Sequence, residues 1–199
     1  MNRVQRQVQK LLRSSATGRS RELVAAGVTR SELSRMMAAG QITRVGRGLY
    51  ALPMYQSGAH GALVAVAKRV PRALFCLLTA LRFHELTTQA PFEVWIAIGN
   101  KDHPPRIDYP PLRIVRLSEF ALEAGVQTHR VDGTSVRVTS VAKTVTDCFK
   151  FRNKVGLDVA IEALREARRA KDASADDLWR FAKINRVANV MRPYLEAVL

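Results

Sequence analysis

The sequence predicts an α+β fold in which residues 1–58 form a small domain and residues 59–199 form a larger, mixed α/β domain. Apolar residues recur at helical spacing through the first 40 residues, and helical and strand-like patterns alternate thereafter. The density of positive charge also changes at the boundary after residue 58. Residues 1–58 contain ten basic and two acidic side chains, a net charge of +8, whereas the other 141 residues contain 22 and 15, a net charge of +7. Pro53 and Gly58 bound a segment that we predict to be the linker.

The composition excludes several classes of protein. The chain has 199 residues, 47% apolar and 25% charged, which excludes wholesale disorder. It has no uninterrupted run of about 20 apolar residues that could span a bilayer, and its basic N-terminal segment lacks the apolar core of a secretory signal. Cys76 and Cys148 are too far apart for a metal motif, so we expect no metal, no cofactor and a reducing, cytoplasmic location. The net charge of +15 favours an anionic partner such as nucleic acid.

Three helices are predicted in the N-terminal segment. Apolar residues at 4, 8, 11 and 12 give the first, and the second covers 21–26, with Ser20 as its cap and Gly27 at its end. Thr29 and Glu32 have the spacing of a capping box, in which each side chain bonds the other residue's backbone amide. This box predicts a third helix over 30–39, which Gly40 terminates.

Two short strands follow these helices. Residues 41–45 and 49–52 are strand-like, and the glycines of 46–48 allow a tight turn between them. The second and third helices are joined by a short turn that contains glycine, as in a helix-turn-helix. With the hairpin added, the segment predicts a winged helix-turn-helix.

This arrangement predicts a surface that binds double-stranded DNA. The N-terminal outward residues of a helix in the major groove reach base edges, and arginine pairs with guanine through two hydrogen bonds. Arginines beside glycines in a wing suit phosphates or the minor groove. The candidate DNA-binding residues are Thr29, Arg30, Ser31, Ser34 and Arg35 in the third helix and Arg44 and Arg47 in the wing. The alternative is a structural three-helix unit whose arginines are merely solvated.

The same segment resembles a known family. Its residues read Gly27-Val-x-Arg-x-x-Leu33 and then Gly40-x-Ile-x-Arg44-x-Gly46-Arg-Gly-x-Tyr50-x-Leu-Pro53, which is similar to the N-terminal winged helix of AbiEi-type antitoxins. The resemblance is strongest over 20–53 and looser over 77–86, 91–97 and 139–147.

That resemblance implies the antitoxin and transcriptional repressor of a type IV toxin–antitoxin pair. Such a protein represses its own operon by binding inverted repeats in double-stranded DNA. It also counters a nucleotidyltransferase-like toxin without a stable complex, through its C-terminal domain. The resemblance implies no enzymatic activity and no membrane partner. The oligomeric state stays open, with a monomer that binds cooperatively as one option.

The remaining residues predict a mixed scaffold. Helices are expected over 59–69, 75–85, 141–151, 157–169, 175–184 and 187–198, and strands over 92–98, 112–117, 126–131 and 135–138. Basic residues follow the helices that end near 150 and 169, where they could extend a DNA-binding face, meet RNA or an acidic partner, or simply solvate helix ends.

Few residues of this part suggest chemistry. His84-Glu85 lacks the second histidine of a zinc motif, and we interpret Asp102-His103 as an exposed turn and Cys148 as a core thiol. Lys143 and Asp147 are four apart on one helix, which is usually a surface pair.

Two other functions stay open at this stage. The acidic residues Glu93, Asp102 and Asp108 are the nearest approach to a metal-dependent nuclease, although the usual motif is missing. An RNA- or ribosome-associated binder is the other alternative, but aromatic residues that could stack on bases are scarce in the basic segment.

Overall fold

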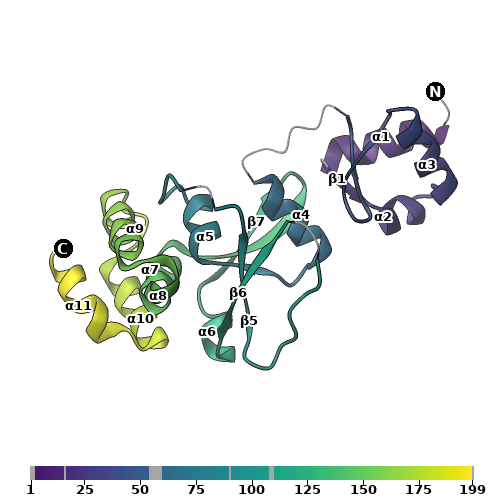
Figure 1. The fold of residues 1–199 in the computed structure, drawn as a ribbon. Coiled ribbons are helices and arrows are strands. Elements are labelled where there is room, and N and C mark those ends of the chain that lie inside the picture. The colour runs from purple at the N-terminus through teal and green to yellow at the C-terminus, as the bar shows by residue number, and fades with distance from the viewer. Residues whose placement is uncertain (1–2, 16, 54–59, 90, 108–109, 199) are drawn as a thin grey trace. The chain divides into compact units, whose positions relative to one another are not determined.

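The computed structural model describes residues 3–15, 17–53, 60–89, 91–107 and 110–198 (Figure 1). Contacts divide the chain into two units. The first holds the chain through Pro71 with Ile107–Pro110 and Arg130–Ser135, and the second holds Arg72–Arg106, Pro111–His129 and Val136–Leu199. The predicted boundary after residue 58 lies outside the described residues. Helices and strands occur in both units, which confirms the α+β class.

The N-terminal elements are three helices and a small antiparallel sheet. They are α1 (Arg3–Ser15), β1 (Thr17–Arg19), α2 (Ser20–Ala25), α3 (Arg30–Ala38), β2 (Thr43–Gly46) and β3 (Leu49–Ala51). The sheet has the order β1-β3-β2, so β3 lies in its centre. The sequence did not predict β1, because three residues are too few to show an alternation. A Cβ atom at Gly18 would lie 2.9 Å from Cδ2 of Leu12, so a larger residue at this position would displace that core side chain.

One apolar core holds these helices together. It joins α1, α2, α3 and the segments that follow α2 and α3 through Val8, Leu12, Leu23, Val28, Leu33, Met36 and Ile42, each at most 3% exposed. Met37 is half-buried and packs against this cluster. Burial of the apolar faces leaves the opposite face of α3 to solvent.

The larger sheet has five strands in the order β6-β5-β4-β8-β7. The strands are β4 (Leu74–Phe75), β5 (Val94–Gly99), β6 (Leu112–Leu117), β7 (Val126–Val131) and β8 (Thr134–Thr139). β5 runs parallel to β6, and β4 pairs antiparallel to β5 and parallel to β8. Ile96, Val138 and Phe75 in the three inner strands are each fully buried.

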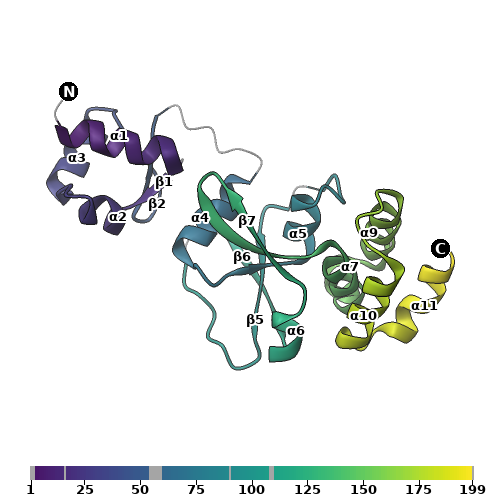
Figure 2. The same ribbon diagram turned by 180° about the vertical axis from the view of Figure 1, so that it is seen from behind.

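Helices account for most of the rest of the chain. They are α4 (Gly61–Arg69), α5 (Leu77–Phe83), α6 (Glu119–Glu123), α7 (Val141–Lys150), α8 (Arg152–Val155), α9 (Leu157–Arg169), α10 (Ala175–Asn185) and α11 (Ala188–Glu196). Figures 1 and 2 show α7 to α11 gathered in one bundle. α7 is its central helix, because it packs against α5, α9 and α10 and is buried at every residue from Ala142 to Phe149.

Besides β1, the sequence did not predict three other short elements. They are β4, α6 and α8, which have two, five and four residues. None is long enough to show a period, and β4 pairs only with strands that are distant in sequence, β5 and β8.

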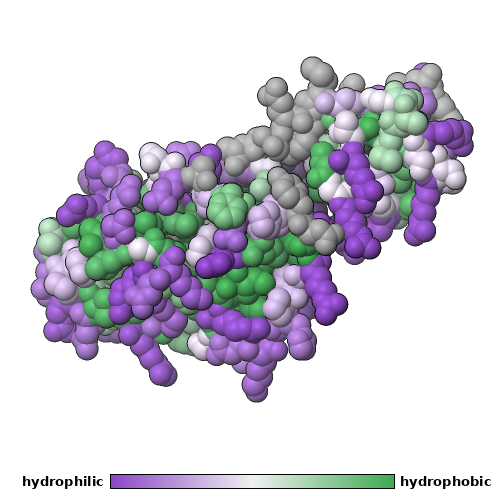
Figure 3. All heavy atoms as spheres, in the orientation of Figure 1, coloured by the Kyte–Doolittle hydropathy of each residue, from purple (hydrophilic) through white to green (hydrophobic). Residues whose placement is uncertain are grey.

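The described residues contain no helix that is both long and apolar enough to cross a bilayer. On the face drawn in Figure 3, hydrophilic side chains cover much of each unit. Apolar side chains are also visible among the hydrophilic ones within each unit.

Candidate nucleic-acid interface

The start of α3 is fixed by a reciprocal cap. Oγ1 of Thr29 accepts a hydrogen bond from the backbone amide of Glu32 at 3.2 Å. Oε2 of Glu32 in turn accepts from the backbone amide and the hydroxyl of Thr29, each at 2.8 Å. The predicted capping box is therefore present. The hydrogen bonds from Thr29, first from its amide and then from its hydroxyl, hold the pKa of Glu32 below its ordinary value, so this carboxylate is charged near neutrality.

Both helices of the predicted helix-turn-helix end as the sequence predicts. Gly27 and Gly40 adopt φ angles of +88° and +64°, which favour glycine. In each case the backbone amide of the next residue donates a hydrogen bond to a carbonyl oxygen of the helix. Val28 donates to Leu23, and Gln41 donates to Met36. The first of these motifs ends α2 and leaves a four-residue turn, 26–29, before α3.

All seven candidate residues lie on the surface of the N-terminal elements. Four of them project from the first two turns of α3, on the face away from the buried Leu33 and Met36. Thr29 is the cap that precedes them, and the last two lie on β2 and in the turn after it. The exposed set is Thr29, Arg30, Ser31, Ser34, Arg35, Arg44 and Arg47.

The hairpin that carries Arg44 and Arg47 is tied to the helices. β2 and β3 pair with Thr43 opposite Ala51 and Arg44 opposite Tyr50, and the register shifts between Arg44 and Gly46. Of the two turn glycines, only Gly48 adopts a positive φ, +66°. Nε of Arg44 donates to the carbonyl oxygen of Gly46 at 3.2 Å, which directs this side chain along the hairpin.

Three contacts of this region were not predicted. Ser20 is the first residue of α2 rather than its cap, and the backbone amide of Arg19 donates to Glu22 instead, at 2.8 Å. The amide of Ser20 donates to the carbonyl oxygen of Gly48 at 2.9 Å, which links α2 to the hairpin turn. The Nε2 group of Gln7 in α1 donates to the carbonyl oxygen of Ala26 at 2.8 Å and supports the turn between α2 and α3.

Comparison with known proteins gives a match over these same elements. Residues 6–53 match the family model of a transcriptional regulator, the AbiEi antitoxin. The AbiEi match begins in α1 and ends just after β3, so it contains all seven candidate residues. It confirms the resemblance seen in the sequence for this part of the chain. No curated protein matches the chain.

A solved structure extends the likeness in fold beyond the AbiEi match. The crystal structure of the RV2827C protein from Mycobacterium tuberculosis resembles this chain with a TM-score of 0.64 and 13% sequence identity. The likeness covers 100% of this chain and 81% of that protein. It shows a shared fold.

The predicted surface pair of α7 is instead buried. Side chains of Lys143 and Asp147 are 0% and 1% exposed, and they form an ion pair within the bundle. Nδ2 of Asn185 in α10 donates to Oδ1 of Asp147 at 2.7 Å and to Oγ1 of Thr146 at 3.1 Å. Burial raises the pKa of Asp147, although Lys143 opposes this shift. The expectation of a surface pair was wrong, because spacing along a helix does not reveal which face is covered.

The other sequence candidates of this part have structural roles. Cys148 and Cys76 are buried free thiols, and burial raises the pKa of both well above the ordinary value, so neither is a ready nucleophile. Asp102 and His103 lie in an exposed loop, where Oδ2 of Asp102 accepts from the amide of Gly99 at 2.8 Å.

Glu93 and Asp102, the described residues among those considered for a nuclease, belong to no metal-binding group. Within the described residues, no group of three or more histidine, cysteine, aspartate or glutamate side chains is placed to hold a metal ion. Asp108 lies outside the described residues.

Proposed function

We propose that the chain is a sequence-specific DNA-binding protein that uses residues 1–58 as a winged helix-turn-helix. In this proposal α3 enters the major groove, where Arg30, Ser31, Ser34 and Arg35 read base edges. Arg44 and Arg47 on the hairpin contact phosphates or the minor groove. The observation that supports it is the exposure of all seven candidate residues on the capped helix α3 and the hairpin that follows it, together with the AbiEi match over the same residues.

The AbiEi match over residues 6–53 supports a proposal about the biological role. We propose that the protein represses its own toxin–antitoxin operon by binding inverted repeats, and that residues 59–199 counter a nucleotidyltransferase-like toxin without a stable complex. The proposed role is that of the antitoxin of a type IV system, and it would be carried out in the cytoplasm. It requires binding and no catalysis.

Substitution of single arginines tests the assignment of grooves. We expect Arg30→Ala and Arg35→Ala to cost about 1–3 kcal/mol of binding free energy on the cognate site only, because base contacts distinguish sequences. Arg47→Ala is expected to weaken binding to all duplexes to a similar extent, because a phosphate contact carries no base information. The measurement is a mobility shift with duplex DNA from upstream of the gene and with a shuffled duplex of the same composition.

Arg165→Ala is the matched control, because it removes one exposed arginine from α9, outside the proposed interface. It should leave binding to both duplexes nearly unchanged. Equal behaviour of Arg35→Ala and Arg47→Ala on the two duplexes would contradict the groove assignment. Preference for structured RNA over duplex DNA in a competition, or cleavage of plasmid with Mg²⁺, would contradict the proposed function itself.

A further inference from the structure

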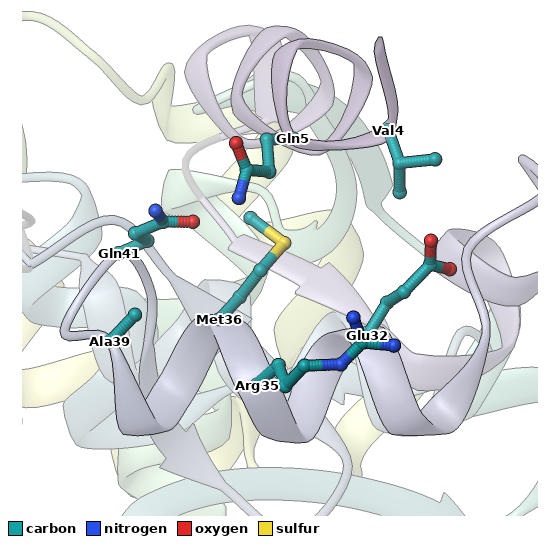
Figure 4. A pocket seen from close by; sticks show the side chains of 7 residues that line it. All are labelled: Val4, Gln5, Glu32, Arg35, Met36, Ala39 and Gln41. Atoms are coloured by element: carbon teal, nitrogen blue, oxygen red, sulfur yellow. The ribbon is translucent and has the colours of Figure 1, made fainter. Parts of the chain in front are cut away.

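A pocket of about 280 Å³ lies between α1 and α3 of the N-terminal elements. Its lining residues are Val4, Gln5, Glu32, Arg35, Met36, Ala39 and Gln41. Figure 4 shows Gln5 and Met36 extending toward each other from α1 and α3, while Gln41 lies at one end of the pocket and Glu32 at the other. The volume is slightly below the roughly 300–1,000 Å³ typical of drug-sized ligands, so a smaller molecule would fit.

The two charged residues of the lining, Glu32 and Arg35, carry opposite charges and so favour a ligand without net charge. Thr29 holds the carboxylate of Glu32 in its ionised state, and Arg35 carries a permanent positive charge. A carboxylate group on a ligand can pair with the guanidinium of Arg35. A second anionic group would be repelled by Glu32, whereas an ammonium group would not. The complementary charge pattern is therefore that of a zwitterion.

The remaining lining residues define the other features of the ligand. Oε1 of Gln41 is buried and has no hydrogen-bond donor, and Figure 4 shows this oxygen directed toward Gln5 and Met36. A buried acceptor without a partner is costly, so an N–H group placed there would be favourable. Val4, Met36 and Ala39 supply an apolar surface for a short aliphatic group.

We propose that this pocket binds a free amino acid or dipeptide with short aliphatic side chains, and that the bound zwitterion weakens DNA binding. The second half rests on the proposed function, in which Arg35 reads a base. A guanidinium that pairs with the ligand's carboxylate is withdrawn from the groove, which couples the two sites through one side chain.

Calorimetry on the full chain tests the pocket without reference to DNA. The probes are L-alanine, L-valine, L-leucine and the dipeptide alanyl-valine, and we expect at least one to bind with a Kd below about 1 mM. Ala39→Phe fills the pocket and should abolish binding, whereas Ala38→Phe places the same ring on a neighbouring exposed position that does not line it. Gln41→Leu removes the unpaired acceptor and should weaken binding about fivefold.

Failure of every probe to bind the unmodified chain would overturn the proposal. Equal binding by the Ala39→Phe and unmodified chains would also overturn it, provided that circular dichroism shows both folded. Fluorescence anisotropy with duplex DNA then tests the coupling, and a saturating zwitterion should raise the apparent Kd about fivefold or more. An unchanged Kd would overturn the coupling while leaving the pocket, and a chain that binds no DNA would instead contradict the proposed function.

Discussion

Lys143 and Asp147 are both buried in α7, so desolvation governs the energetics of this ion pair. The attraction between the two charges offsets the cost of removing them from water only while both are present. Oδ2 of Asp147 and Oδ1 of Asn185 have no hydrogen-bond partner, so the polar cluster is incompletely satisfied even in the intact chain. A single substitution in this cluster should therefore lower the free energy of unfolding strongly.

Lys143→Met leaves the Asp147 carboxylate buried without its cation, and we expect the free energy of unfolding to fall by about 3–5 kcal/mol. The loss should shrink as pH falls, because burial already raises the pKa of Asp147 and protonation removes the unpaired charge. The free energy of unfolding is measured by urea titration, with tryptophan fluorescence as the signal. Trp95 and Trp179 both lie in the same unit as Lys143, so the signal reports on that unit. The double variant Lys143→Met/Asp147→Leu should recover most of the stability, and an equally unstable double variant would contradict this explanation.

His84 gives the protein a pH dependence of a different kind. Its Nε2 atom lies 2.7 Å from the carbonyl oxygen of Thr139, and burial lowers the pKa of the ring below its ordinary value. The unfolded chain therefore binds a proton at a higher pH than the folded chain does. The contribution of His84 to stability is complete above about pH 6.5 and is lost as pH falls through the lowered pKa.

The measurement is the urea midpoint between pH 5 and pH 7.5, which we expect to decrease toward the acid end. His84→Gln keeps a side-chain N–H donor for Thr139 but does not titrate, so it should reduce this decrease. A variant with the same pH profile as the unmodified chain would contradict the role of His84. His129, whose ring centre lies 6.3 Å from that of His84, is the second histidine to substitute as a control.

At the scale of elements, α3 depends on its cap because it is only nine residues long. A short helix has few internal hydrogen bonds, and the cap satisfies amides that would otherwise be unpaired. Thr29→Ala removes both the acceptor for the amide of Glu32 and one donor to its carboxylate. We expect a loss of about 1 kcal/mol in the stability of the N-terminal elements.

Amide hydrogen exchange in α3 measures this loss, since both tryptophans lie outside the N-terminal elements. Thr29→Ser retains the hydroxyl oxygen and should restore protection. If Thr29→Ser exchanges as fast as Thr29→Ala, the hydroxyl does not stabilise the helix.

The elements that the sequence predicts well are those whose ends are defined locally. Thr29, Gly27 and Gly40 place the ends of α2 and α3 to within one residue, because a cap or a positive φ angle is a property of a few consecutive residues. β4 could not be predicted in this way, since two residues become a strand only between β5 and β8. The residues of the candidate interface could be predicted because they follow a helix cap and a turn that consecutive residues define. The pocket could not be predicted, because it forms only where α1 and α3 come together in the fold.

At the scale of the whole molecule, the charge is the property that the proposed function uses most directly. The net charge of +15 draws the protein to any polyanion, and the N-terminal 58 residues carry +8 of it. This attraction is independent of base sequence, so it contributes to affinity but does not select a site. Arg30 and Arg35 must supply selectivity against that background.

Salt dependence separates these two contributions. A protein that neutralises roughly 6 to 8 phosphates releases a similar number of counterions, so the logarithm of affinity should fall with the logarithm of salt with a slope of about −5 to −7. Fluorescence anisotropy in a KCl series gives this slope for the upstream duplex. Arg47→Ala should make the slope less steep by about 1, because one phosphate contact is lost. A slope near zero would mean that the basic surface does not contact the DNA backbone, and the exposed arginines of α3 and the hairpin would then require another explanation.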